Sequence, residues 1–87
     1  MRLKYAIERA TMFLEKEYEI LVTPKKVKPK DLVTDLKRLD KKDLMDLTFL
    51  GIDNKDLEFF AADDKQLKDI KTLLKTVKDL DIKTIKL

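Results

Sequence analysis

The sequence predicts an all-α fold, a compact single domain of about five short helices that spans residues 1–87. Two observations support this prediction. Apolar residues recur at steps of three and four in several segments, which is the spacing of one helix face. Residues that favour helix starts also stand just before several of these segments. The pattern leaves room for a minor extended segment at 20–28 or at 81–87.

The first predicted helix covers roughly residues 2–19. Its apolar stripe consists of Leu3, Ala6, Ile7, Ala10, Phe13, Leu14 and Tyr18. Residues 20–23 are short and β-branched, so they fit an extended exit or a small strand. A basic connector bounded by prolines follows at 24–30, and residues that precede proline avoid the helical region.

Four further helices are expected, at about 29–38, 41–50, 54–60 and 64–79. Pro29 suits the first position of its helix, and Gly51 suits the position just beyond the end of another. The short helix at 54–60 is expected to present Leu57 and Phe60 to the core. The tail at 81–87 fits two interpretations, a last helical turn capped by Asp81 or a strand paired with residues 20–23.

The tripeptide Lys-Asp-Leu occurs four times, beginning at Lys30, Lys42, Lys55 and Lys78. We interpret it as a recurring helix start rather than a repeated ligand motif. Asp40 and Asp53 stand where an N-cap accepts hydrogen bonds from the first-turn N–H groups. Asp63, followed by Gln66, gives another start of this kind. The copy that begins at Lys78 does not fit, because it lies inside a helical pattern.

The composition argues against catalysis. The chain has no Cys, His, Ser or Trp, and Gly51 is its single glycine. These absences remove thiol, serine and imidazole chemistry, the usual zinc ligands and any glycine-rich phosphate loop. The acidic residues at 53–58 lack the ligand order of a calcium loop. We therefore predict no enzyme activity, no cofactor and no metal site.

The sequence also bears on cellular location. Its longest apolar run has four residues, at 59–62, so we predict no membrane span. The first residues mix acids and bases, unlike a secretory signal. Because the chain has no cysteine, a reduced, cytoplasmic setting is the default expectation.

A non-catalytic protein–protein interaction module, such as a small adaptor, inhibitor or regulatory accessory protein, is the first functional expectation. Its candidate partner-binding residues are Met1, Tyr5, Met12 and Phe59. The first three lie on the predicted helix opposite its apolar stripe, and Met and aromatic residues are enriched at protein interfaces. The partner is another protein or a second copy of the chain, since a small core makes a homodimer plausible.

A helical nucleic-acid-binding protein is the alternative. Residues 24–38 carry six bases and two acids, and residues 65–87 carry seven bases and three acids. The candidate residues are Lys25, Lys26, Lys28, Lys30, Lys65, Lys68, Lys71, Lys75 and Lys78. No aromatic residue interleaves with these lysines, and no Arg, Asn or Gln cluster offers base recognition. Such binding is expected to tolerate any sequence and to weaken with salt.

Overall fold

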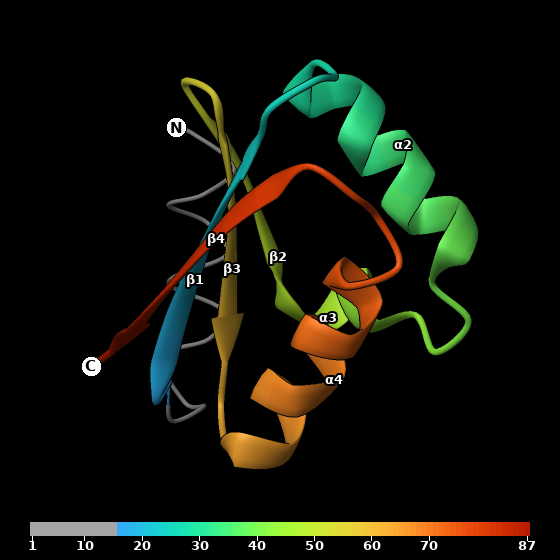
Figure 1. Ribbon diagram of the computed structural model, residues 1–87. Helices are drawn as coiled ribbons and strands as arrows, with labels where there is room; N and C mark the ends of the chain where they lie inside the picture. Colours follow the sequence, from blue (N-terminus) through green and yellow to red (C-terminus); the bar gives the residue numbers. More distant parts are fainter. Residues whose placement is uncertain (1–15) are drawn as a thin grey trace, which may run out of the picture.

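The computed structural model describes residues 16–87 and shows a mixed fold, in which helices cover one face of a four-stranded antiparallel sheet (Figure 1). In chain order the elements are β1 (Tyr18–Pro24), α2 (Pro29–Leu39), α3 (Leu44–Thr48), β2 (Phe49–Asp53), β3 (Asp56–Ala61), α4 (Asp64–Leu74) and β4 (Leu80–Lys86). The predicted all-α bundle of about five short helices is therefore wrong.

The strands follow one another across the sheet in the order β2-β3-β1-β4, and all neighbours are antiparallel. β4 returns the end of the chain to β1, so that Tyr18 lies opposite Lys86 and Pro24 lies opposite Leu80. The interpretation of the tail as a strand paired with residues 20–23 is thus confirmed. The predicted helix at 2–19 is wrong at 16–19, because residues 16–17 are not helical and residues 18–19 belong to β1. Its remainder at 2–15 lies outside the described residues.

The main core lies between the sheet and the two longer helices. Ile20 and Val22 alternate along β1 toward the helices, as the period of two in a strand requires. Leu32 and Leu36 of α2, and Ile70 and Leu74 of α4, face them at the four-residue step of a helix. All six side chains are fully buried, and burying one such side chain contributes about 1.5–3 kcal/mol to folding.

β3 is buried on both faces of the sheet, which explains why its sequence resembles a helix. Phe59 points into the core below the helices and is 1% exposed, while Phe60 points to the opposite face and is 3% exposed. A strand covered on both sides lacks the alternation of polar and apolar residues that marks a half-exposed strand. The predicted helix at 54–60 is therefore wrong.

The starts of α2 and α4 agree with the sequence analysis. Pro29 occupies the first turn of α2. The Asp63 carboxylate accepts a hydrogen bond from the backbone N–H of Gln66 at 2.8 Å, and the Gln66 side chain accepts one from the N–H of Ala62 at 2.7 Å. This reciprocal arrangement satisfies N–H groups that a helix start leaves unpaired. α4 ends at Leu74 rather than near residue 79, and the chain then turns into β4.

The Asp40 side chain caps α3, although the N-cap position of that helix is Asp43 rather than Asp40 and the helix is shorter than predicted. Its carboxylate accepts hydrogen bonds from the backbone N–H groups of Lys42, Leu44 and Met45, at 3.3, 3.0 and 2.8 Å. α3 has only five residues, because the chain becomes extended at Phe49 and enters β2. Of the predicted helix at 41–50, only Leu44–Thr48 is helical.

Asp53 does not cap a helix, so that prediction is wrong. It ends β2 and lies opposite Asp56 across a tight hairpin, where Asn54 has a positive φ of 58°. Asn is among the residues that adopt this left-handed conformation most readily.

Gly51 lies within β2 and does not end a helix, so its predicted role is also wrong. Phe49 lies opposite Phe59 and Gly51 lies opposite Glu58, so Leu50 is an extra residue that bulges the strand. Gly51 has a φ of 140°, a conformation that L side chains rarely adopt. β2 is therefore a short and irregular edge of the sheet.

We predict that Asp40→Ala lowers the free energy of unfolding by about 1–2 kcal/mol, because N–H groups of α3 lose their acceptor. Asp53→Ala is the matched control, since Asp53 is exposed and caps no helix, and its effect is expected to stay within about 0.5 kcal/mol. Urea denaturation of both variants measures the difference. Equal losses of stability in the two variants would contradict the assigned capping role.

Candidate functional site

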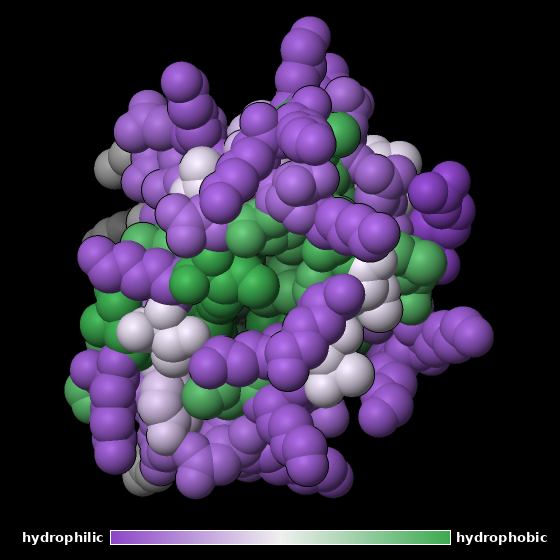
Figure 2. Space-filling model, in the orientation of Figure 1, coloured by the Kyte–Doolittle hydropathy of each residue, from purple (hydrophilic) through white to green (hydrophobic). Residues whose placement is uncertain are grey.

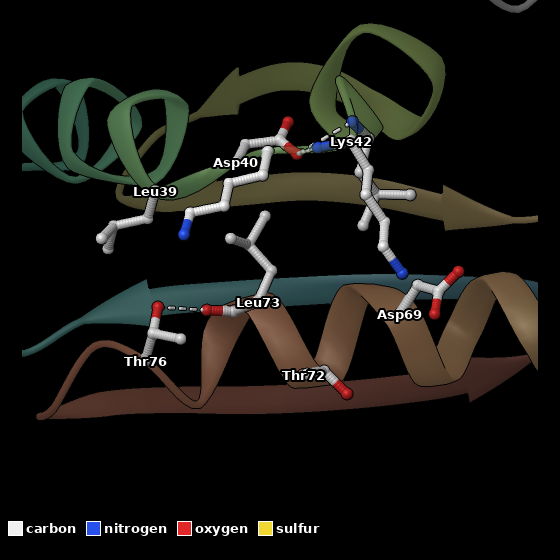
Figure 3. A pocket seen from close by; sticks show the side chains of 9 residues that line it. Leu39, Asp40, Lys42, Asp69, Thr72, Leu73 and Thr76 are labelled. Atoms are coloured by element: carbon white, nitrogen blue, oxygen red, sulfur yellow. Dashed lines mark hydrogen bonds between the residues drawn. The ribbon is translucent and has the colours of Figure 1, made fainter.

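A groove with a largely apolar first half runs beside α4, where that helix faces the end of α2, the following connector and α3. It consists of two adjoining hollows of about 190 and 240 Å³, which share Lys42, Leu44 and Asp69 as lining residues. In the first hollow, Leu39 and Leu73 approach it from opposite walls (Figure 3). The second hollow continues past Leu44 to Leu47 and the first turns of α4.

Two leucines of the groove are unusually exposed for their size. Leu39 is 41% exposed and Leu47 is 63% exposed, whereas Leu44 beside them is 8% exposed. Leu39 is the last residue of α2, and α3 has too few residues to bury both Leu44 and Leu47 against the core. Clustered exposed apolar side chains around a hollow are typical of a binding surface.

Charged side chains form the rim of the groove. Lys41, Lys42 and Lys65 are exposed, and the Lys42 ammonium extends toward Asp69 from the opposite wall (Figure 3). The carboxylates of Asp40 and Asp63 are hydrogen-bonded to backbone N–H groups at helix starts. The rim therefore carries three lysines and the three carboxylates of Asp40, Asp63 and Asp69, and none of these lysines forms an ion pair within residues 16–87.

Of the predicted partner-binding residues, Phe59 alone lies in the described part of the chain. Phe59 lies in the core, beside Phe49 with 5.2 Å between ring centroids, so its ring is not presented to solvent. Phe60 is buried as well, with the Lys16 ammonium 5.5 Å from its ring centroid. The other three predicted residues, Met1, Tyr5 and Met12, lie outside the described residues.

The predicted lysines fall into two groups. Lys25, Lys26 and Lys28 lie in the β1–α2 connector, which meets the segment between α4 and β4 that carries Lys78. The N–H of Lys25 donates to the carbonyl of Asp79 at 2.9 Å, and the Lys26 ammonium lies 3.6 Å from the Asp79 carboxylate. The structure thus brings lysines from two distant segments to one end of the molecule, together with one carboxylate.

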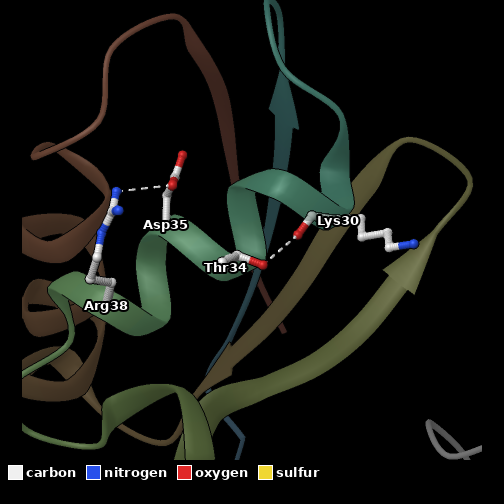
Figure 4. A network of polar contacts seen from close by, with 4 residues as sticks. All are labelled: Lys30, Thr34, Asp35 and Arg38. Atoms are coloured by element: carbon white, nitrogen blue, oxygen red, sulfur yellow. Dashed lines mark hydrogen bonds and ion pairs between the residues drawn. The ribbon is translucent and has the colours of Figure 1, made fainter.

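The remaining predicted lysines lie on helices or, for Lys75, directly after one. Lys65, Lys68 and Lys71 belong to α4 and Lys75 follows it, so Lys78 is not part of a helical lysine face as predicted. Lys30 is in the first turn of α2, on the exposed side where Thr34 donates to its carbonyl and Arg38 pairs with Asp35 at 3.1 Å (Figure 4). Exposed pairs of this kind contribute little to stability.

Two structural findings bear on chemistry and location. Within residues 16–87 no group of three or more Asp, Glu, His or Cys side chains is arranged to hold a metal ion. None of the helices in the same part of the chain is long and apolar enough to cross a membrane.

A short hydrogen bond joins the sheet to α4. The Tyr18 hydroxyl donates to the Asp64 carboxylate at 2.5 Å. This bond raises the pKa of Tyr18 above its ordinary value of 10.0, and burial and the negative charges of Asp64 and Glu17 act in the same direction. Deprotonation of the phenol removes the donated proton and places two negative charges together. The contact therefore ties α4 to β1 only while Tyr18 is protonated.

Comparison with family models, curated proteins and solved structures finds no match for this chain.

We predict that Asp64→Asn lowers the pKa of Tyr18 toward 10.0, measured by phenolate absorbance. The Tyr5→Phe background removes the second tyrosine from the titration. Because the pKa of Tyr18 is raised in the folded state, the stability that this contact adds is complete below about pH 10 and is lost as the pH rises through the raised pKa. An unchanged titration in the Asp64→Asn variant would show that the hydrogen bond does not control Tyr18.

Proposed function

We propose that this protein is a non-catalytic protein–protein interaction module, a small adaptor or regulatory accessory protein, that binds a partner segment in the groove beside α4. The observation that carries the proposal is the pair of adjoining hollows with Leu39 and Leu47 exposed at their margins. Covering these leucines and the apolar lining removes hydrocarbon surface from water, at about 25 cal/mol per Å².

The rim defines the chemistry of the partner segment. Lys41, Lys42 and Lys65 border the groove, and two of the nearby carboxylates already accept backbone hydrogen bonds. A segment with apolar side chains on one face and acidic side chains beside them satisfies both the leucines and the lysines. An amphipathic helix laid in a groove is a common form of such recognition, in which complementary charge speeds association and fixes orientation.

We expect Leu39→Lys combined with Leu47→Lys to reduce the recovery of a specific protein partner at least about tenfold, the effect of removing an interface hot spot. The tagged protein serves as bait in a cell lysate treated with nuclease and washed at moderate salt. Bound proteins are identified and quantified by mass spectrometry against the unchanged bait.

Val27→Lys with Ile52→Lys is the matched control. These residues are 44% and 45% exposed and lie outside both hollows, so the control adds the same charge to equally apolar, exposed positions. A partner that binds the control but not the groove variant supports the proposal. Equal retention by both variants, or binding that nuclease abolishes, would overturn it. Thermal unfolding of each bait verifies that the variants remain folded.

The second candidate function is sequence-tolerant nucleic-acid binding, favoured by the meeting of Lys25, Lys26 and Lys28 with the segment that carries Lys78. A cluster of this kind attracts phosphates mainly by releasing counterions. The acidic residue Asp79 within the cluster weakens its field, so we place this candidate second. For either function we propose a cytoplasmic setting, as expected for a chain without cysteine.

If this cluster binds phosphates, replacing Lys25, Lys28 and Lys78 by Gln lowers the affinity for a fluorescein-labelled DNA duplex at low salt. The logarithmic salt dependence then becomes shallower by about 0.9 for each phosphate that the protein no longer neutralises. Lys37→Gln with Lys55→Gln provides exposed controls outside the cluster. Fluorescence anisotropy measures both quantities, and no binding by the unchanged protein at low salt would remove this candidate.

A further inference from the structure

β4 forms an open edge of the sheet. In the described part of the chain it pairs with β1 alone, over seven residues and without a register shift. The opposite edge, β2, has five residues and is interrupted by the bulge at Leu50 and by Gly51. Bulges and short strands blunt an edge against further pairing. β4 is therefore the regular edge of this sheet.

Two hydrogen bonds show which backbone groups of β4 point outward. The N–H of Lys25 donates to the carbonyl of Asp79, and the N–H of Leu87 donates to the carbonyl of Glu17, both at 2.9 Å. In an antiparallel ladder, hydrogen-bonded pairs alternate with pairs that are not bonded. Odd-numbered residues of this segment thus bond to β1. The N–H and C=O groups that face the open edge belong to Leu80, Ile82, Thr84 and Lys86.

The side chains of β4 favour one particular self-pairing. If Ile82 lies opposite Ile82 of a second copy, then Asp81 lies opposite Lys83 of that copy, and Lys83 lies opposite its Asp81. These two positions are not hydrogen-bonded in the new ladder, so their side chains come closest together. Opposite charges at such positions stabilise the pairing. If the two-fold axis passes through residue 83 instead, Lys83 lies opposite Lys83 of the second copy, and the repulsion of like charges disfavours that pairing.

An apolar surface lies beside this edge. α2 and α4 pack mainly over β1 and β3, and Ile82 on the helix-bearing side of β4 is 36% exposed. Val77 and Leu80, which lead into and begin β4, are only partly buried. Apolar groups gather in the middle of the face seen in Figure 2. In Figure 1, which has the same orientation, β4 and the segment before it run beside this area.

We propose that two copies of this chain form a two-fold homodimer by antiparallel pairing of their β4 strands, with Ile82 on the axis. The two sheets become one continuous sheet, and both helix layers lie on the same side. Ile82 covers its counterpart, and charged pairs between Asp81 and Lys83 flank it on the other face. This surface is separate from the groove beside α4, so the inference goes beyond the proposed function and does not depend on it.

Charge reversal tests the register. Asp81→Lys and Lys83→Asp each place like charges opposite each other at both flanking positions, so each variant alone is expected to dimerise at least about tenfold more weakly. An equal mixture of the two variants restores opposite charges at both positions and is expected to recover the dimer. Sedimentation velocity of the full chain, from micromolar to millimolar concentration, measures the monomer–dimer equilibrium.

Ile82→Pro provides a second test that preserves the fold. The N–H that proline removes points to the open edge and not to β1, so the sheet keeps its own hydrogen bonds while the dimer loses two. Leu39→Lys with Leu47→Lys is expected to leave the dimer unchanged. An unchanged protein that stays monomeric at all concentrations would overturn the proposal. Dimerisation that survives Ile82→Pro, or that fails only in the groove variant, would do the same.

Discussion

The antiparallel pairing of β1 with β3 is the contact on which the rest of the described structure depends. Ile20 and Val22 lie directly opposite Phe59 and Leu57, and together they form the wall against which α2 and α4 pack. The pairing joins segments separated by two helices and a strand, so folding must close a long loop before these contacts form. β2 pairs with β3 and β4 pairs with β1, so these two strands extend the sheet on either side of the central pair. α2 and α4 pack mainly on the central pair itself.

The four copies of Lys-Asp-Leu show why local sequence predicts helix starts but misses the sheet. Asp31 lies in the first turn of α2, as expected, and Asp56 begins β3 instead. Asp43 and Asp79 adopt positive φ angles of 53° and 62°, one before α3 and the other before β4. The same three letters thus occur in a helix, a strand and two left-handed turns, because each segment's packing against β1 or β3 outweighs a local preference of about 1 kcal/mol.

α2 agrees closely with the prediction, and α4 begins where predicted, with the expected cap formed by Asp63 and Gln66, but ends at Leu74 rather than near residue 79. β3 escapes prediction because burial on both faces removes the alternating pattern of a strand. The groove could not be predicted for a different reason. It exists only where the end of α2, the short α3 and one side of α4 meet. Leu39 is exposed at the end of α2, and Leu47 is exposed because α3 is too short to bury it together with Leu44.

The three surfaces proposed for binding occupy different parts of the fold. The groove lies in the helix layer, beside α4, whereas the lysines of the β1–α2 connector and Lys78 gather where β1 ends and β4 begins. The open edge of β4 is a third surface. A single small sheet therefore leaves separate regions available for apolar, ionic and backbone-mediated contacts.

The irregularity of β2 has a consequence for behaviour at high concentration. Because Leu50 bulges and Gly51 takes a conformation that a flat strand does not use, this edge offers a poor template for an incoming strand. A sheet with one such edge can gain strands only at its other edge. When two copies pair symmetrically through that edge, the only edges left in the described part of the two chains are the two irregular β2 strands. We therefore expect the bulge to disfavour fibril formation, and the φ of 140° at Gly51 suits the single glycine of the chain to this position.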